Sequence, residues 1–312
     1  MDGIFVGLDV SKDAVDGHVQ PTGECFVAGT DEAALATVVE RVRAVAPTLV
    51  VLEATGGYEI PVAAALATAG LPVAVVNPRQ IRDFARATGQ LAKTDALDAR
   101  VIARFAEAVQ PPVRPLPSAQ AQALSELLAR RRQVVDMLGA ELNRQRQARA
   151  AQLQHRIARH VAWLRRALAE LDRDIAQLIR SSPVWRDKEN VLTSMPGIGD
   201  VTAHALIADL PELGQLDRRR IAALVGIAPF NRDSGQWRGR RMIGGGRPAV
   251  RRALYMATIV AIQYNPAIAA GYQRLVRGGR PKKVALIAAM RKVLTTLNAM
   301  LRDQRPWQSQ IA

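Results

Sequence analysis

The sequence predicts a mixed α/β domain followed by a larger, mostly helical part. Short apolar runs bounded by turn residues alternate with helical periodicities up to residue 112. From Ser118 to Arg180 apolar residues recur at helical spacing, with no proline and one glycine, and from Val184 onward helices alternate with glycine turns. Aromatic residues make up only 4% of the 312 residues while alanine and leucine abound, which favours helix. A chain of this length is expected to form two or three domains.

The first domain shows five strand signals. They lie at 4–9 (IFVGLD), 14–20 (AVDGHVQ), 24–30 (ECFVAGT), 48–55 (TLVVLEAT) and 71–77 (LPVAVVN). The helices are expected from Thr30 or Asp31 to Val45, over 61–70, over 78–88 and from Lys93 to Val109. A three-strand antiparallel meander followed by alternating helix and strand is the order expected of an RNase H-like fold, with a doubly wound sheet of another kind as the alternative.

The proline-rich segment QPPVRPLP, residues 110–117, marks the first expected boundary. We therefore expect domains at 1–112, 113–183 and 184–312. The middle segment is predicted to form one or two long helices, and a coiled coil formed by them would dimerise the chain. The arginines of this segment fit two interpretations equally well, a solvent-exposed helix face or a surface that contacts nucleic acid.

The charge of the chain points to a polyanionic partner. The net charge is +15 and the pI is about 11.1, which indicates nucleic acid. Residues 1–117 nevertheless hold 10 Lys and Arg against 14 Asp and Glu, whereas residues 181–312 hold 21 against 8. An acidic domain in a nucleic-acid-binding protein repels phosphates unless its acids hold metal ions.

The remaining composition excludes several classes of protein. The single cysteine, Cys25, allows no intramolecular disulfide and fits a reducing compartment. Four scattered histidines give no zinc constellation. The sequence shows no apolar run expected to span a bilayer, and no signal peptide is expected. These features predict a protein of the cytoplasm, at the nucleoid if it binds DNA.

Four acids are candidates for a metal site. Asp9 ends the first expected strand, Glu53 ends the fourth, and Asp95 and Asp98 share a face of the helix after the fifth strand. Carboxylates without histidine or cysteine suit Mg²⁺ or Mn²⁺, and two such ions can activate a nucleophile at a phosphodiester. Taken singly, each acid also has an ordinary structural explanation, as a strand-end turn, a helix cap or a solvated helix surface.

The block SMPGIGDVTAHAL, residues 194–206, matches a helix-hairpin-helix. Gly197 and Gly199 would let backbone N–H groups approach a DNA phosphate at a helix N-terminus, whatever the base sequence. The alternative is an ordinary turn between two packed helices.

The block from 226 to 254 is rich in glycine and arginine around Ser234. Guanidinium groups bind phosphates and stabilise the charge of a phosphoryl-transfer transition state. A serine here is a candidate nucleophile that needs a base or a metal for activation, and the alternative is a turn-forming Ser-Gly pair. The residues expected to contact nucleic acid in this block are Arg232, Trp237, Arg238, Arg240, Arg241, Arg247, Arg251 and Arg252.

Five blocks in this order carry a resemblance to a known family. They are GLDVSK, VLEATGGYE, VVNPRQIRDFARATGQLAKTDALDARVIA, MPGIGDVTA and GIAPFNRDSGQWRGRRMIGGGRPAVRRALY. The chain resembles the DEDD insertion-sequence transposases of the IS110 (one-hundred-and-ten) family, to which the Piv-type DNA invertases are related. The resemblance extends from Gly7 to about Leu301.

The resemblance implies a RuvC-like first domain whose D-E-D-D quartet falls on Asp9, Glu53, Asp95 and Asp98. It implies a C-terminal transposase domain whose nucleophilic serine falls on Ser234, with a covalent phosphoserine intermediate. Members of the family work as homo-oligomers, dimers or tetramers, in which the quartet of one subunit faces the serine of another. Some use a structured bridge RNA that pairs with target and donor DNA, and whether this chain does so is left open.

Three functions are therefore weighed. The leading one is a transposase or recombinase that cuts and rejoins DNA, of which a site-specific invertase is a variant. The second is a hydrolytic junction-resolving endonuclease in which the quartet activates water and Ser234 is structural. The third is a scaffold that binds nucleic acid without catalysis.

Overall fold

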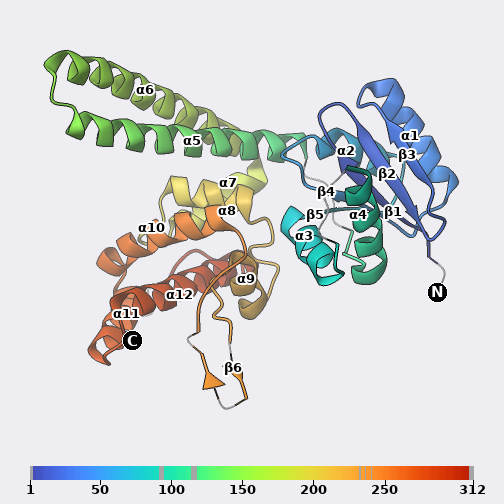
Figure 1. Cartoon of the computed structure of the whole chain (residues 1–312). Coiled ribbons are helices and arrows are strands. Elements are labelled where there is room, and N and C mark those ends of the chain that lie inside the picture. The colour runs from blue at the N-terminus through green and yellow to red at the C-terminus, as the bar shows by residue number, and fades with distance from the viewer. Residues whose placement is uncertain are drawn as a thin grey trace. The chain divides into compact units, whose positions relative to one another are not determined.

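The structure, a computed structural model, describes residues 3–90, 95–113, 118–231, 233–235, 237–239 and 241–308 (Figure 1). For residues 95–97, 237 and 238 it describes the backbone alone. The chain forms two compact units, residues 1–117 and 118–312. The division lies near the first predicted boundary at residue 112. The second unit is not divided again near residue 183, so a separate helical domain there stays a prediction.

The first unit is built on a five-stranded sheet. Its strands are β1 (Phe5–Val10), β2 (Val15–Gln20), β3 (Cys25–Ala28), β4 (Leu49–Glu53) and β5 (Val73–Val76). They lie in the order β3-β2-β1-β4-β5. β1, β2 and β3 form an antiparallel meander, whereas β4 runs parallel to both β1 and β5. All five predicted strands are present, and the predicted mixed α/β class is confirmed.

Helices cover both faces of this sheet. They are α1 (Glu32–Ala44), α2 (Glu59–Thr68), α3 (Pro78–Ala87) and α4 (Asp95–Val109). Val6, Leu8 and their neighbours share a buried cluster with side chains of α1 and α2. Phe5 and Val51 belong to a second cluster with side chains of α3 and α4. Because successive strand residues point to opposite faces, odd-numbered β1 residues face α4 and even-numbered ones face α1 and α2.

Two of these helices begin with a side-chain cap, of which the one at Asp31 was predicted. The Asp31 carboxylate accepts a hydrogen bond from the Ala34 N–H at 2.9 Å, which fixes the start of α1. Asn77 accepts one from the Arg79 N–H at 2.9 Å and is followed by Pro78 at the first position of α3. The helix predicted from Lys93 is described from Asp95, because residues 91–94 lie outside the described part of the chain.

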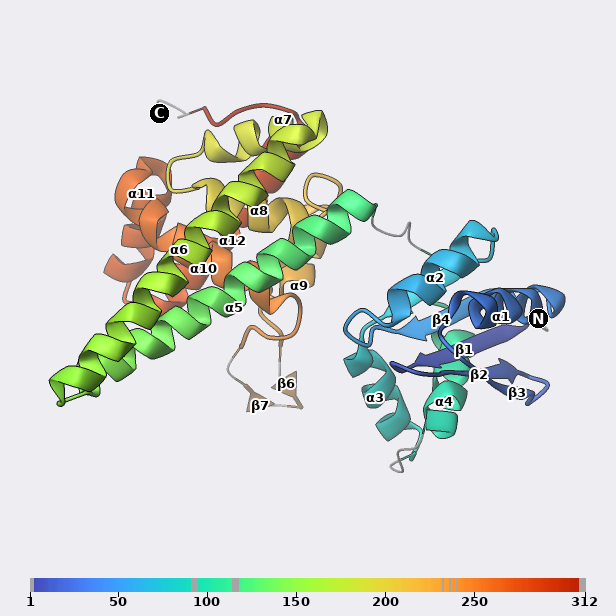
Figure 2. The ribbon, with the colours of Figure 1, turned by 90° about the horizontal axis from the view of Figure 1, so that it is seen from above.

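The second unit begins with a long helical hairpin. α5 (Ala119–Gln147) and α6 (Ala151–Ser181) pack against each other within one chain, and their far end projects beyond the other helices of the unit (Figures 1 and 2). Val134, Val161 and Leu164 are buried. Arg131 of α5 forms an ion pair with Asp172 of α6. The segment was predicted to form one or two long helices and forms two, whereas dimerisation through them stays a prediction.

The remaining helices form the core of the second unit. They are α7 (Pro183–Thr193), α8 (Asp200–Asp209), α9 (Arg218–Val225), α10 (Pro248–Tyr264), α11 (Pro266–Arg277) and α12 (Lys282–Arg302). Leu124, Leu128, Ile175 and Ile179, at the base of the hairpin, belong to the same buried cluster as these helices. Because hairpin and helices share one core, they form one unit.

α12 corrects one expectation from the sequence. It is long and apolar enough, by length and composition, to cross a membrane, whereas the sequence was expected to contain no such segment. Half of its apolar window is buried, and Val293, Leu294 and Leu297 lie fully within the core. Its apolar character is therefore explained by its central position in the unit.

Candidate functional site

Two predicted acids lie side by side at one edge of the sheet. β1 and β4 are parallel neighbours in which Leu8 pairs with Leu52, so Asp9 and Glu53 follow at the carboxyl ends of adjacent strands. Side chains two residues apart along a strand point to the same face of the sheet. Asp9 is an even number of residues from Phe5, and Glu53 from Val51, so both acids are on the face covered by α4. Both residues are half-buried.

α4 approaches this part of the sheet unusually closely. A Cβ atom at Gly7 would lie 2.3 Å from the Ala103 nitrogen and 2.4 Å from the Ala99 oxygen, so only glycine allows this approach. Phe105, farther along α4, shares a buried cluster with Phe5 at the amino end of β1. α4 therefore runs back along β1, and its first turns lie toward the carboxyl end of that strand.

Asp95 and Asp98 occupy those first turns of α4. Asp98 immediately precedes Ala99 and is half-buried. For Asp95 only the backbone is described. The backbone thus brings all four predicted acids toward one end of the sheet.

A fifth acid at this edge escaped the sequence analysis. Asp16 pairs directly with Asp9 across the antiparallel strands β1 and β2, and it is also half-buried. Directly opposed residues share a face of the sheet, with Cβ atoms about 5 Å apart. Asp16 can be identified from the register of the β1–β2 hairpin. The spacing of acids along the chain does not reveal it.

The chemistry of these side chains suits a hard divalent cation, because all of them are carboxylates. Among the side chains that the structure describes, which exclude Asp95, no group of three or more His, Cys, Asp or Glu is arranged to hold a metal ion. Asp9, Glu53, Asp98 and Asp16 each interact with other groups. Two observations therefore support a metal site here: all the candidate ligands are carboxylates, and they lie at the same edge of the sheet.

The loop after Glu53 is held by Glu59, a second residue that sequence reasoning missed. The buried Glu59 carboxylate accepts hydrogen bonds from the Thr55 N–H at 3.0 Å, the Thr55 hydroxyl at 3.2 Å and the Gly57 N–H at 2.8 Å. Gly56 and Gly57 have φ angles of 83° and 123°, which side-chain-bearing residues rarely adopt. Glu59 thus fixes the turn that follows Glu53.

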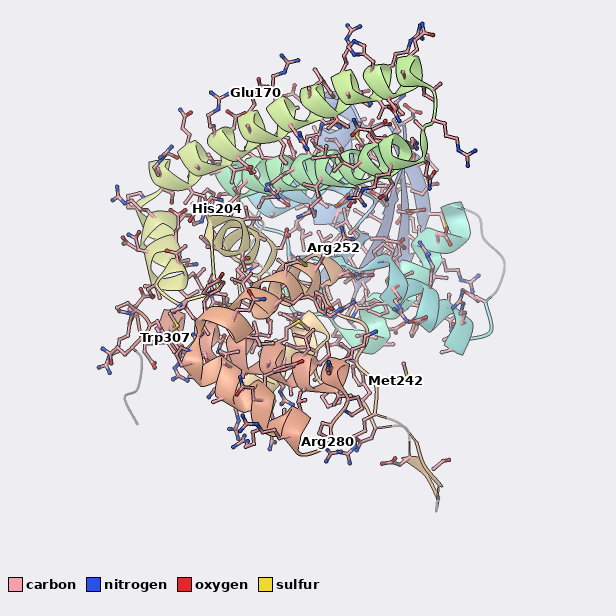
Figure 3. All side chains as sticks on the ribbon, turned by 90° about the vertical axis from the view of Figure 1, so that its left-hand side faces the viewer. Glu170, His204, Met242, Arg252, Arg280 and Trp307 are labelled. Atoms are coloured by element: carbon pink, nitrogen blue, oxygen red, sulfur yellow. The ribbon has the colours of Figure 1, made fainter. Side chains whose placement is uncertain are left out.

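The predicted glycine turn lies between α7 and α8. Gly197 has a φ of 99°, and a Cβ there would lie 2.5 Å from the Ala261 Cα, so α10 packs against the turn itself. Gly199 precedes α8 with open space where its side chain would be. The two helices are also joined by His204 and Glu189, whose Nε2 and Oε1 atoms lie 2.6 Å apart; Figure 3 labels His204.

Ser234 lies at the exposed end of a short ribbon. β6 (Asp233–Ser234) pairs with β7 (Trp237–Arg238), and Ser234 is opposite Trp237. The ribbon is closed at its base by the hydrogen bond from the Phe230 N–H to the Met242 carbonyl. No side-chain hydrogen bond joins the Ser234 hydroxyl to another residue that the structure describes. Arg232 and Arg240 lie outside the described residues, and of Trp237 and Arg238 only the backbone is described.

Two of the arginines expected to contact nucleic acid have partners inside the protein. Arg247 forms two hydrogen bonds with the Glu212 carboxylate, at 2.5 and 2.6 Å, and a third with the Asp209 carbonyl. Arg251 donates to the carbonyls of Val225 and Gly245. These guanidinium groups fasten the loop to the helical core, a structural role that the sequence analysis did not foresee.

Arg241 and Arg252 are placed differently from those two. Arg241 is exposed. The Arg252 guanidinium lies 3.5 Å from the Asp136 carboxylate, and both side chains are about two-thirds exposed. Figure 3 labels Arg252 on α10. Their contact with nucleic acid stays a prediction, as does that of Arg247 and Arg251.

Comparison with known proteins gives two family matches and several relatives. Residues 6–151 match a family described as transposase, and residues 189–273 match the transposase IS116/IS110/IS902 family. The chain is 31% identical to the pilin gene-inverting protein of Moraxella bovis over 265 residues, which cover 84% of this chain and 82% of that protein. The Moraxella lacunata protein of the same name is 30% identical over the same shares. An insertion element IS110 protein of 43.6 kDa from Streptomyces coelicolor is 29% identical over 45% of this chain and 34% of its own length.

Proposed function

Because the chain belongs to the IS110 family of transposases and is related to the pilin gene-inverting proteins, we propose that it cuts and rejoins DNA through the carboxylates of Asp9, Glu53, Asp95 and Asp98 and the hydroxyl of Ser234. The observation that carries this proposal is the placement of Asp9 and Glu53 on adjacent parallel strand ends, with α4 fixed over them by Gly7. The strand order β3-β2-β1-β4-β5 supports an RNase H-like, RuvC-like identity for this unit.

The four carboxylates are proposed to bind Mg²⁺ or Mn²⁺. A divalent cation bound there supplies Lewis-acid polarisation of a phosphodiester and stabilises the oxygen that leaves. Its positive charge would let an acidic unit accept a phosphate. The residues of the chain orient the reaction: Gly7 sets the distance of α4 from β1, and Glu59 holds the turn after Glu53.

Ser234 is proposed to be the nucleophile. Its Oγ gives up its proton and forms a bond to phosphorus as one P–O bond of the DNA backbone breaks. The strand oxygen that leaves takes up a proton and becomes a hydroxyl, and the resulting serine phosphodiester conserves the bond energy. A strand hydroxyl can then attack the same phosphorus, release Ser234 and rejoin the DNA. On the family relationship, we propose that the carboxylate site of another subunit activates Ser234, which requires a homo-oligomer.

The glycine turn between α7 and α8 is proposed to act as a helix-hairpin-helix. Its support is the left-handed Gly197 and the α8 N-terminus, which begins without a side-chain cap. Asp200 in the first turn of α8 is unfavourable for a phosphate there, so this assignment stands on the backbone alone. Guidance by a bridge RNA is proposed on the family relationship, and a place of action at the bacterial nucleoid, in the cytoplasm, follows from the DNA substrate.

Inversion is the variant of this reaction that the relatives favour. The two relatives that match over 82% of their own length are both named as pilin gene-inverting proteins. Transposition and inversion share cutting and rejoining and differ in the arrangement of the two DNA sites. Plasmid substrates with two sites in inverted orientation distinguish inversion from excision by restriction mapping.

A nicked DNA substrate tests the serine. The nick lets the end released on cutting diffuse away, so wild-type protein with Mg²⁺ should accumulate a DNA adduct that survives denaturing electrophoresis. Ser234→Ala should give none, while Ser181→Ala, a change of another exposed serine, should behave as wild type. Free 5′-phosphate and 3′-hydroxyl products without an adduct would instead identify a hydrolytic junction-resolving enzyme. DNA binding that needs no divalent cation, with neither an adduct nor cut products, would identify a non-catalytic scaffold.

A further inference from the structure

The charge of the α5–α6 hairpin is concentrated in its outer half. Residues 142–169 contain seven arginines and no acidic residue. The rest of the hairpin, residues 118–141 and 170–181, contains five arginines and six acidic residues. The net positive charge of the hairpin therefore belongs entirely to the part that projects beyond the helical core (Figures 1 and 2).

Within this outer half, one face of α6 gathers arginines around a tryptophan. Arg156, Arg159, Trp163 and Arg166 follow each other at steps of three, four and three residues, so they share a face of the helix. With Arg165, they line a shallow hollow of about 680 Å³. We call these five residues the α6 basic face. At 1.5 Å per residue it extends about 15 Å along the helix.

The arginines of the α6 basic face have no partners within the described structure. All four are exposed, and none forms an ion pair or side-chain hydrogen bond with another described residue. The nearby Glu141 carboxylate is paired with Arg144 at 2.7 Å and lies 3.6 Å from His160. Figure 3 shows nitrogen-tipped side chains projecting outward from the edge of α6 that is turned away from the rest of the unit.

Trp163 lies at the centre of this face and is partly exposed to solvent. Its side chain is 47% exposed, although a tryptophan usually buries most of its surface. The His160 ring stacks on it, with centroids 5.9 Å apart and planes 25° from parallel. The stacking fixes the orientation of the indole and leaves part of it open to solvent.

We infer that the α6 basic face binds a single-stranded stretch of nucleic acid, with phosphates on the arginines and one unpaired base stacked on Trp163. Guanidinium groups bind phosphates, and base–aromatic stacking is the sequence-tolerant part of single-strand recognition. A second copy of the chain is the competing occupant, but it would bring two uncompensated clusters of arginine together. This surface goes beyond the recombination chemistry proposed above and does not depend on Ser234.

The test measures binding by the full-length chain carrying Ser234→Ala, so that no cutting occurs. The probes are fluorescently labelled single-stranded RNA, single-stranded DNA of the same sequence, and the corresponding DNA duplex. Arg156→Ala/Arg159→Ala should weaken single-strand binding about tenfold. The same change should lower the salt dependence by about 1.4, because each phosphate that an arginine neutralises on a single strand adds roughly 0.7 to that slope. Arg173→Ala/Arg180→Ala removes two exposed arginines nearer the base of the same helix, which are not among these five residues, and is the matched control.

Variants of Trp163 separate the contribution of base stacking from that of the arginine charges. Trp163→Leu should weaken single-strand binding about tenfold, the scale of one base stacked on an aromatic ring, whereas Trp163→Phe should keep most of the affinity. Comparing the affinities for single-stranded RNA and DNA shows which of the two this surface prefers, and a preference for either supports the inference. The inference is overturned if the two arginine pairs behave alike and Trp163→Leu binds as tightly as its parent. It is also overturned if only duplex binding changes, or if the variants alter the sedimenting mass and not the affinity.

Discussion

Asp9 and Asp16 lie directly opposite each other in the antiparallel pair of β1 and β2. Acidic side chains in this relationship share one face of the sheet, and like charges so placed disfavour the folded state. Here they lie at the strand edge that also carries Glu53. A divalent cation bound at this edge would therefore stabilise the fold as well as serve the reaction.

Mg²⁺ should raise the melting temperature of the wild-type protein, and Asp9→Asn should remove most of this increase. A ligand that binds only the folded state at well above its dissociation constant adds about 1 to 3 kcal/mol. The measurement is a thermal melt with Mg²⁺ or with EDTA, and Asp13→Asn, an exposed acid in the β1–β2 turn, is the control. Equal Mg²⁺ responses in all three proteins would remove Asp9 from the proposed metal site.

Gly7→Ala should destabilise the first unit by about 1 to 3 kcal/mol, the usual cost of overpacking a core. The added Cβ would meet backbone atoms of α4, which cannot turn aside as a side chain can. Gly139→Ala is the matched control, because that glycine lies in the interior of α5 with open space around it and alanine should stabilise the helix by about 0.5 to 1 kcal/mol. Urea denaturation measures the free energy of unfolding of both variants. If Gly7→Ala were as stable as the wild type, α4 would move to accommodate the added Cβ without cost.

Glu59→Ala should cost about 1 to 3 kcal/mol, because the partly buried Thr55 and Gly57 N–H groups lose their acceptor. DNA cutting should fall as well, since the turn after Glu53 is no longer fixed. Glu59→Gln keeps one side-chain oxygen and should be intermediate in both measurements. Glu107→Ala, which removes an exposed acid of α4, should change neither. Normal cutting by a destabilised Glu59→Ala protein would separate the turn from catalysis.

His18 should make the protein less stable as the pH falls. Its burial, followed by the neighbouring Arg100 charge, holds the pKa of His18 below its ordinary value of 6.5, an effect that a hydrogen bond with Gln20 opposes. Between the lowered pKa and 6.5 the unfolded chain binds the proton and the folded chain does not, so stability decreases as the pH falls below about 6.5. Denaturation curves at several pH values should show a smaller loss for His18→Gln. His155→Gln, at an exposed position of α6, should keep the loss of the wild type.

Features that depend on local pattern were predictable from the sequence. The five strands and the Asp31 cap follow from alternation and capping signals, and the hairpin helices follow from their apolar spacing. The position of Asp9 and Glu53 on neighbouring strand ends was predictable because the first and fourth strands are neighbours in an RNase H-like sheet. Each of these predictions used residues that are close together in the chain or a common strand order.

Features set by tertiary packing were not predictable in the same way. Asp16 becomes relevant only once the register of β1 and β2 is known. The loop arginines look alike in sequence, yet Arg247 is paired with Glu212 from 35 residues away and Arg251 binds backbone carbonyls. The apolar length of α12 is explained only by its central place in the core. Sequence spacing contains none of this information.

The exposed ribbon that carries Ser234 has a consequence for genome integrity. A serine hydroxyl is a weak nucleophile until a base or a metal activates it, and in the proposed reaction the activating group belongs to another subunit. A solitary chain diffusing along chromosomal DNA would then leave the duplex intact, and breakage would begin only where several copies meet on paired sites. Such a requirement would limit accidental damage to the host.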